Sequence, residues 1–142
     1  MRIVEPSATL TLEAAEAIVS AAIREGLKNG VPLNAAVVDQ GGNLIAFLGS
    51  TGLFLESIKI AQDKARSAAG FGMSTDALTG ALRGDDDVYN GIAFRAGVTA
   101  FGGGFPIRVE GMLVGGIGVS GGSLDDDRGA AKAGLLAVGI EL

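Results

Sequence analysis

Hydrophobic and polar positions repeat along the chain with two different periods, and each change of period marks an expected element. In residues 10–30 the apolar side chains recur every three or four positions, which predicts an amphipathic helix ending at Asn29-Gly30. Residues 33–38 and 44–48 are strand-like runs, which we expect to form a hairpin around a polar turn. The first of these strands is apolar on both faces, so helices or another subunit should cover the sheet on both sides.

The middle of the chain predicts further helices. Residues 53–72 form a second amphipathic run, and residues 74–82 predict a short helix with Ser74 as its N-cap. The next segment, residues 83–97, has no clear period, and its acidic run fits a solvated turn or the start of a helix. If this segment is extended instead, it would supply an additional strand ahead of the glycine run.

The last third of the chain predicts a second hairpin and a final helix. Residues 105–121 are strand-like on both sides of a turn at Glu110-Gly111. Ser123 and Asp126 match the capping-box pattern, so the final helix should begin there. Two hairpins separated by helices indicate an α+β fold class with an antiparallel sheet of four strands, or five with the uncertain segment.

Composition narrows the function classes. The 142 residues are expected to form one domain, residues 1–142, with 48% apolar residues and a net charge of −5. No basic stripe, long apolar span or signal-peptide pattern is present, which argues against nucleic acid and membrane partners and favours a cytoplasmic protein. The chain has no cysteine and no histidine, so it lacks the usual general base and the usual metal and haem ligands, and we predict no metal site.

Two glycine patterns near the C-terminus resemble catalytic motifs. GIGVSG, residues 116–121, fits the dinucleotide fingerprint, but its glycines fall inside a predicted strand and we expect no second strand after it. GVSGG would make Ser120 a hydrolase nucleophile, yet the histidine base is missing. A dyad of Ser120 with Lys64 or Lys132 is the arrangement that remains, and a strand-end role for Ser120 is the simpler interpretation.

The glycines themselves still need an explanation. Gly116 and Gly118 lie on one face of the predicted last strand, so a crossing helix or a flat ligand should approach the backbone closely there. Three successive glycines, Gly102 to Gly104, precede a strand. They form either an anion-binding nest or a flexible turn.

Three segments of the chain form a recognisable set: AAVVDQGGNLIAF, ESIKIAQDKARSAAGFGMST and GGGFPIRVEGMLVGGIGVSGGSLDDDRGAAKAGL. They resemble the GlcG/HbpS family, which includes the C-terminal domain of PduO-type proteins, and the resemblance covers nearly the whole chain. It implies a profilin-like or PAS-like fold, with a five-stranded antiparallel sheet flanked by helices, and assembly into a homo-oligomer, a dimer or larger, up to an octamer. Some members bind haem or iron or assist haem degradation, and others accompany glycolate or diol catabolism.

This chain departs from the family pattern in two respects. Residues 49–53 lack the arginine and aspartate that many members carry after the second strand. Histidine is absent, so a haem cofactor would need Tyr89, Met73, Met112 or a hydroxyl oxygen as its ligand.

The candidate site residues combine polar groups with the glycine-rich loop. Lys64 has no acid one helical turn away, because Ile60 and Ala68 occupy those positions, so it is a candidate desolvated base; a surface lysine is the alternative. The candidate catalytic residues are Lys64, Tyr89, Asp39 and Glu56. The candidate ligand-binding residues are Gly102, Gly103, Gly104, Phe105, Pro106 and Arg108. Structural roles compete for several of them: Asp39 suits a hairpin turn, Glu56 a pair with Lys59, and Tyr89 and Arg108 packing or surface positions.

Three functions remain open. The chain is a small-ligand-binding protein for a tetrapyrrole, iron or an organic acid; or a cofactor-free lyase, hydratase or isomerase for a small carboxylate; or a structural subunit of an oligomer. In the second case the glycine loop would hold the carboxylate, and a lysine, tyrosine or acid would move the proton.

Overall fold

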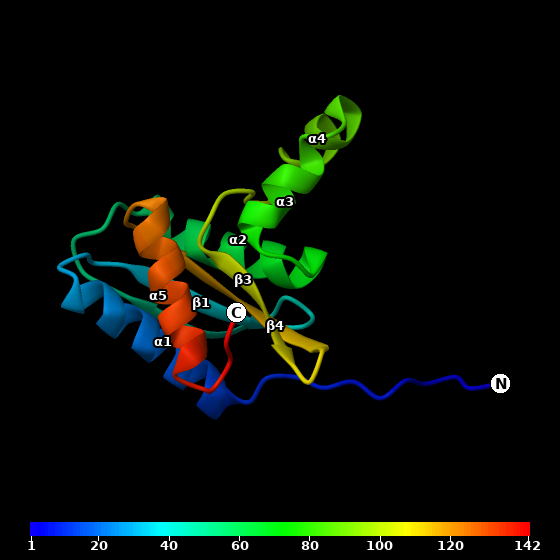
Figure 1. Cartoon of the computed structure of the whole chain (residues 1–142), viewed down its shortest axis with the longest axis horizontal. Helices are drawn as coiled ribbons and strands as arrows, with labels where there is room; N and C mark the ends of the chain where they lie inside the picture. Colours follow the sequence, from blue (N-terminus) through cyan, green and yellow to red (C-terminus); the bar gives the residue numbers. More distant parts are fainter.

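The computed structural model describes residues 1–142 as two layers of helices around one antiparallel sheet (Figure 1). The helices are α1 (Leu12–Lys28), α2 (Glu56–Phe71), α3 (Thr75–Leu82), α4 (Asp86–Ile92) and α5 (Leu124–Leu136). The strands are β1 (Asn34–Asp39), β2 (Leu44–Gly49), β3 (Gly104–Val109) and β4 (Met112–Ser120). The sheet order is β2-β1-β4-β3, and every neighbouring pair is antiparallel. The α+β class and both hairpins are therefore confirmed.

The number of strands differs from what the family resemblance implied. The sheet has four strands, not five. The uncertain segment forms helix α4 instead of a strand, and Asp85 caps it by accepting hydrogen bonds from the N–H groups of Asp87 and Val88. Acidic residues in a first helical turn are stabilised by the helix dipole, so the acidic run favours helix over strand.

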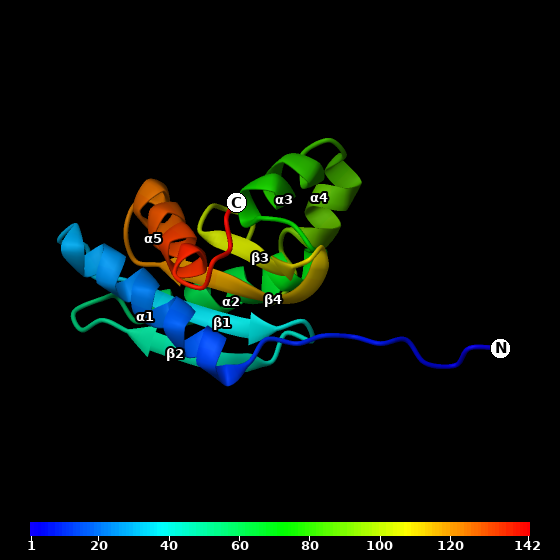
Figure 2. The ribbon, with the colours of Figure 1, turned by 60° about the horizontal axis from the view of Figure 1, so that its bottom comes forward.

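Helices cover both faces of the sheet, as the apolar first strand predicted. Figures 1 and 2 show α1 and α5 side by side on one face and α2 on the other. The main core lies under α1 and α5 and includes Ala35 and Val37 of β1; Ala36 and Val38 point the other way, against α2. Helices α3 and α4 continue from α2 and lie beside the β3 edge (Figure 2). No helix combines the length and the apolar character that crossing a membrane requires.

Helix α2 explains the glycine-thinned face of β4. A Cβ atom on Gly118 would lie 2.1 Å from the carbonyl oxygen of Ala61, and one on Gly116 would lie 2.3 Å from that of Ala65. Both contacts are far shorter than a side chain tolerates, so the helix backbone needs glycine on the strand. Of the two occupants considered for this face, the crossing helix is the one present.

Candidate functional site

A buried ion pair joins α2 to the start of α5. The Lys64 side chain is 1% exposed, and its Nζ donates hydrogen bonds to Asp127 Oδ2 at 3.0 Å and to the Val119 carbonyl at 2.8 Å. The Phe101 ring lies over the same ammonium, with its centroid 4.8 Å from Nζ. Lys64 therefore has an acidic partner after all, on another helix and 63 residues away.

The environment of the pair sets its electrostatics. Burial lowers the pKa of Lys64, and the nearby Asp127 carboxylate opposes this effect. Burial likewise raises the pKa of Asp127, against the attraction of Lys64. The second carboxylate oxygen of Asp127 accepts a hydrogen bond from the Gly122 N–H at 3.0 Å, and the positive end of α5 favours its charge. Each charged atom of the pair thus has partners, as buried ions require.

The glycine loop packs directly on this pair. Gly103 has φ of +120°, and a Cβ on it would lie 2.9 Å from Lys64 Nζ and 2.7 Å from the Val119 carbonyl. The N–H of Gly104 donates to Thr75 Oγ1 at 2.9 Å, and the Gly103 carbonyl accepts from the Val119 N–H. Gly102, Gly103 and Gly104 are all buried. The loop therefore closes over Lys64, and the Gly104 N–H expected for an anion nest is already bonded.

The residues that lead into the loop are also fixed. Ser67 Oγ donates to the Gly97 carbonyl at 3.2 Å and accepts from the Thr99 N–H at 2.9 Å. The Thr79 hydroxyl donates to the Ala100 carbonyl. These bonds hold the backbone before Phe101, and the bond from the Gly104 N–H to Thr75 holds it after. Phe101 itself remains 44% exposed. An exposed aromatic ring on a fixed backbone is a ready surface for a ligand.

A second ion pair bridges α5 and α3 beside the loop. Arg128 donates from Nε and Nη2 to the two carboxylate oxygens of Asp76, at 2.9 and 2.6 Å, and from Nη1 to Asp125 at 3.0 Å. The guanidinium lowers the pKa of Asp76, and the carboxylates raise the pKa of Arg128. A Cβ on Gly102 would lie only 2.6 Å from Arg128 Nε, so this glycine makes room for the bridge.

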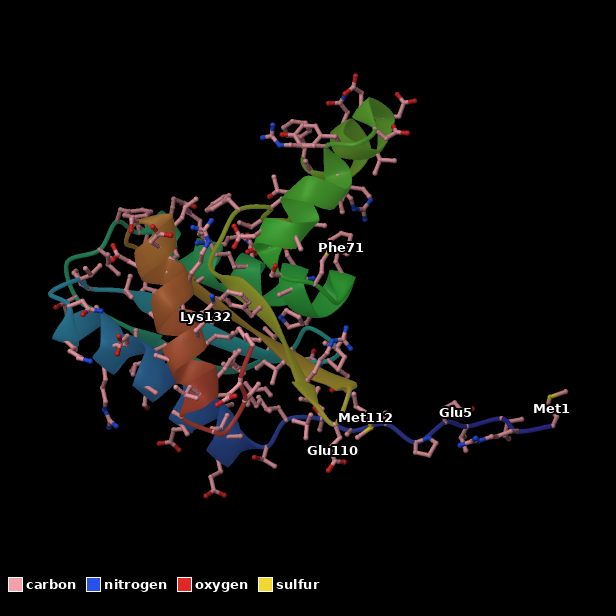
Figure 3. The ribbon with its side chains drawn as sticks, in the orientation of Figure 1. Met1, Glu5, Phe71, Glu110, Met112 and Lys132 are labelled. Atoms are coloured by element: carbon pink, nitrogen blue, oxygen red, sulfur yellow. The ribbon has the colours of Figure 1, made fainter.

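One turn further along α5, Lys132 is exposed and forms no ion pair within the chain. Its Nζ lies 5.8 Å from the centroid of the Phe105 ring. Lys132 also lines a cavity of about 320 Å³ between the end of α5 and the C-terminal residues Ile140 to Leu142. Figure 3 shows it where α5 passes β3. We name the surface made by Phe101, Arg128 and Lys132, with the buried Phe105 ring beside Lys132, the α5–loop face.

Two of the predicted catalytic residues, Asp39 and Glu56, lie outside the α5–loop face. Asp39 accepts from the N–H groups of Gly41 and Asn43, and these bonds lower its pKa and shape the β1–β2 turn. Glu56 lies in the first turn of α2, and Lys59 pairs with Asp63 instead.

Four further residues that the sequence singled out have structural contacts or positions of their own: Tyr89, Arg108, Pro106 and Ser120. Tyr89 lies on α4, not beside Lys64, and packs edge-on against Phe94. Arg108 donates to the Gly72 carbonyl at 3.0 Å, and Pro106 lies in edge strand β3. Ser120 bonds to the Ser57 hydroxyl at 3.1 Å, so it forms no dyad with Lys64.

Sequence reasoning did not select Asp127, Arg128, Phe101 or Asp76 for the site. Asp127 could be noticed only as one of three consecutive aspartates that suit a helix start. Its pairing with Lys64 depends on how α5 lies across the sheet, which no local pattern encodes. The signal that did exist was the absence of an acid one turn from Lys64.

Comparison with known proteins agrees with this architecture. Residues 10–136 match the family model "Haem degrading protein HbpS-like". An uncharacterised 15.0 kDa protein from the dhaT–dhaS intergenic region of Citrobacter freundii is 33% identical over 129 residues, which cover 90% of this chain and 91% of that protein.

Two solved structures extend the likeness to the fold. The crystal structure of HbpS superposes with a TM-score of 0.87 at 32% identity, covering 97% of this chain and 96% of that one. A PduOC–haem complex gives 0.85 at 26% identity, covering 92% and 96%. The chain belongs to the HbpS-like family.

Proposed function

We propose that this protein binds a small anionic ligand, a tetrapyrrole or an organic acid, on the α5–loop face. The observation that carries the proposal is the exposed Phe101 on a fixed backbone, together with Lys132, the α5 cation that forms no ion pair within the chain. An aromatic ring offers a stacking surface, and a free ammonium takes a carboxylate. The structural relative with haem, the PduOC complex, supports a tetrapyrrole as one candidate.

The residues present fit part of a haem group. Phe101 would hold the ring face, and Lys132 would hold a carboxylate, with Arg128 beside it. Iron ligation is a different matter, because the chain has no histidine. Met112 pairs with Val109 at the far end of β3 from Gly104, five residues away, or about 17 Å at the usual rise per residue. The α5–loop face would therefore hold a tetrapyrrole through its ring and carboxylates, and haem, when bound, would bring the iron chemistry.

The geometry favours binding over catalysis by Lys64. The enzyme hypothesis needs that amine to meet a substrate, yet its side chain is 1% exposed and carries Asp127, Val119 and the Phe101 ring on its polar end. A substrate would have to displace the glycine loop to reach it. Lys64 instead supports the backbone that presents Phe101.

The test is a ligand titration with matched lysine variants. Haemin is followed by its absorbance, and a panel of small mono- and dicarboxylates by thermal shift. We expect Lys132→Gln to weaken binding about tenfold, the loss of one charge-assisted hydrogen bond. Phe101→Ala should weaken haemin further.

Lys28→Gln, which removes an exposed lysine from α1, is the control and should bind as the unchanged protein does. Equal affinity in Lys132→Gln and Lys28→Gln would place the ligand elsewhere, and no binding of any probe would remove the proposal.

A further inference from the structure

We propose that a second site, independent of the α5–loop face, binds a small carboxylate or phosphate between α2 and the segment after α4. A cavity of about 270 Å³ opens there, which is a size suited to a small metabolite. Its walls come from one side of α2 and from residues 95–98. We call it the two-arginine pocket, after Arg66 and Arg95.

Both guanidinium groups at this pocket are free. Neither Arg66 nor Arg95 forms an ion pair or a side-chain hydrogen bond within the chain, although acidic residues outnumber basic ones by 16 to 11. Two carboxylates belong to the segments around Arg66: Asp63, beside Gly97, bonds Lys59 at 3.1 Å, and Asp39, in the turn that holds Gly42, accepts from the Gly41 and Asn43 N–H groups. Both carboxylates are already bonded, so the two guanidinium groups remain available to an added anion. Arginine binds carboxylate and phosphate groups in a bidentate geometry, so an anion is the fitting occupant.

Glycines keep Arg66 uncovered. A Cβ atom on Gly97 would lie 3.3 Å from Arg66 Nη1, and a Cβ atom on Gly42 would lie 3.7 Å from Arg66 Nε. Both glycines have φ of +82°, so other residues are disfavoured at these turns. The guanidinium therefore rests between two backbone segments that carry no side chain over it.

The rest of the pocket is rigid and partly apolar. Ser67, at its base, ties α2 to Gly97 and Thr99 through its hydroxyl. Phe71, 38% exposed and labelled in Figure 3, and Val98 add apolar wall. The carbonyl of Gly72, at the negative end of α2, accepts from Arg108, which reduces the repulsion that an anion would meet there. An acid with a small apolar or aromatic part matches both kinds of wall.

The experiment titrates two probes, benzoate and inorganic phosphate, into the full chain at low ionic strength by calorimetry. We expect Arg66→Gln and Arg95→Gln each to weaken binding of the favoured probe at least tenfold. Arg24→Gln is the matched control, because it removes an exposed arginine from α1 that lines none of the pocket. These surface variants should keep the thermal stability of the unchanged chain, which differential scanning fluorimetry checks.

Phe71→Ala separates the two anion sources. It should weaken benzoate but leave phosphate unchanged, so a benzoate preference that depends on Phe71 assigns the pocket to an organic acid. If phosphate binding depends on both arginines and is unchanged by Phe71→Ala, the pocket is assigned to a phosphate group. The proposal is overturned if neither benzoate nor phosphate binds at millimolar concentration. It is also overturned if Arg66→Gln and Arg95→Gln both bind the probes as Arg24→Gln does. Because Lys132→Gln leaves this pocket intact, failure here and failure at the α5–loop face are separate results.

Discussion

At the scale of single residues, Lys64 shows how burial changes the role of a polar group. It has the largest side chain among the fully buried residues, and every contact of its ammonium belongs to the fold. Replacing one partner of a buried pair leaves an uncompensated charge, and the replacement costs more than the pair itself contributes.

We therefore expect Lys64→Met and Asp127→Asn each to lower the free energy of unfolding by about 3–5 kcal/mol. The double variant should lose clearly less than the sum of the two, because no lone charge remains. Urea denaturation of all four proteins measures this coupling. Strictly additive losses would show that the two side chains do not depend on each other.

Asp76 makes a pH prediction with a definite sign. The Arg128 guanidinium lowers the pKa of Asp76 in the folded state below the value near 3.9 of an unfolded chain. Its stabilising contribution is then complete above about pH 4 and is lost as the pH falls through the folded pKa. Asp76→Asn should lower the melting temperature at pH 7 and have a smaller effect at pH 3.

The control for this experiment is Asp86→Asn, which changes an exposed residue of α4. Its melting temperature should stay near that of the unchanged chain across the same range. An Asp76→Asn deficit that is equally large at pH 3 and pH 7 would contradict the assignment of this carboxylate to the Arg128 bridge.

The site residues could be predicted only in part, for a physical reason. Lys64 and the glycines stood out because the sequence breaks local rules there: a lysine without a helical partner and three glycines before a strand. The structure brings these together. Asp127 and Asp76 obey local rules as first-turn residues of α5 and α3, and Arg128 is one of the charged residues that follow, so nothing in the sequence marked them for long-range pairing.

At the scale of elements, the glycines of α5 distinguish helix propensity from helix packing. A Cβ on Gly134 would lie 2.7 Å from the Ile18 carbonyl of α1, whereas a Cβ on Gly129 would meet nothing within 4 Å. Gly134→Ala should therefore destabilise the protein by forcing α1 and α5 apart. Gly129→Ala should stabilise it by about 0.5–1 kcal/mol through helix propensity.

Chemical denaturation of the two alanine variants measures the difference directly, since each changes one glycine in the same helix. Two variants of equal stability would mean that α1 and α5 do not pack closely at Gly134.

Local chemistry explains which elements were predictable. The cap of α3 by Ser74, the capping box of Ser123 and Asp126, and the turn at Glu110-Gly111 all depend on neighbouring residues, and all are confirmed. Helix α4 was not resolved from the sequence, because its seven residues bury no side chain and so leave no periodic apolar pattern. The close crossing of α2 over β4 was visible as glycines, but choosing a helix over a ligand required the tertiary structure.

At the scale of the whole molecule, we propose that the chain assembles with copies of itself. Three apolar residues around the start of α2, Phe54, Leu55 and Ile58, are 56%, 77% and 39% exposed, near the open edge strand β2. Clustered exposed apolar side chains and unpaired strand edges favour association. Light scattering at micromolar concentration should give a multiple of 14.2 kDa, and Leu55→Glu should reduce it. A monomer mass for the unchanged chain would contradict this proposal.

The central proposal for the whole molecule is that ligand binds on the α5–loop face. Hydrogen–deuterium exchange, followed with and without saturating haemin, tests this most directly because it maps the site without any substitution. We predict slower exchange in residues 100–106 and along α5, with α4 and the β1–β2 turn unchanged. Slower exchange confined to α4 around Tyr89, or saturated binding with no change in residues 100–106, would contradict it.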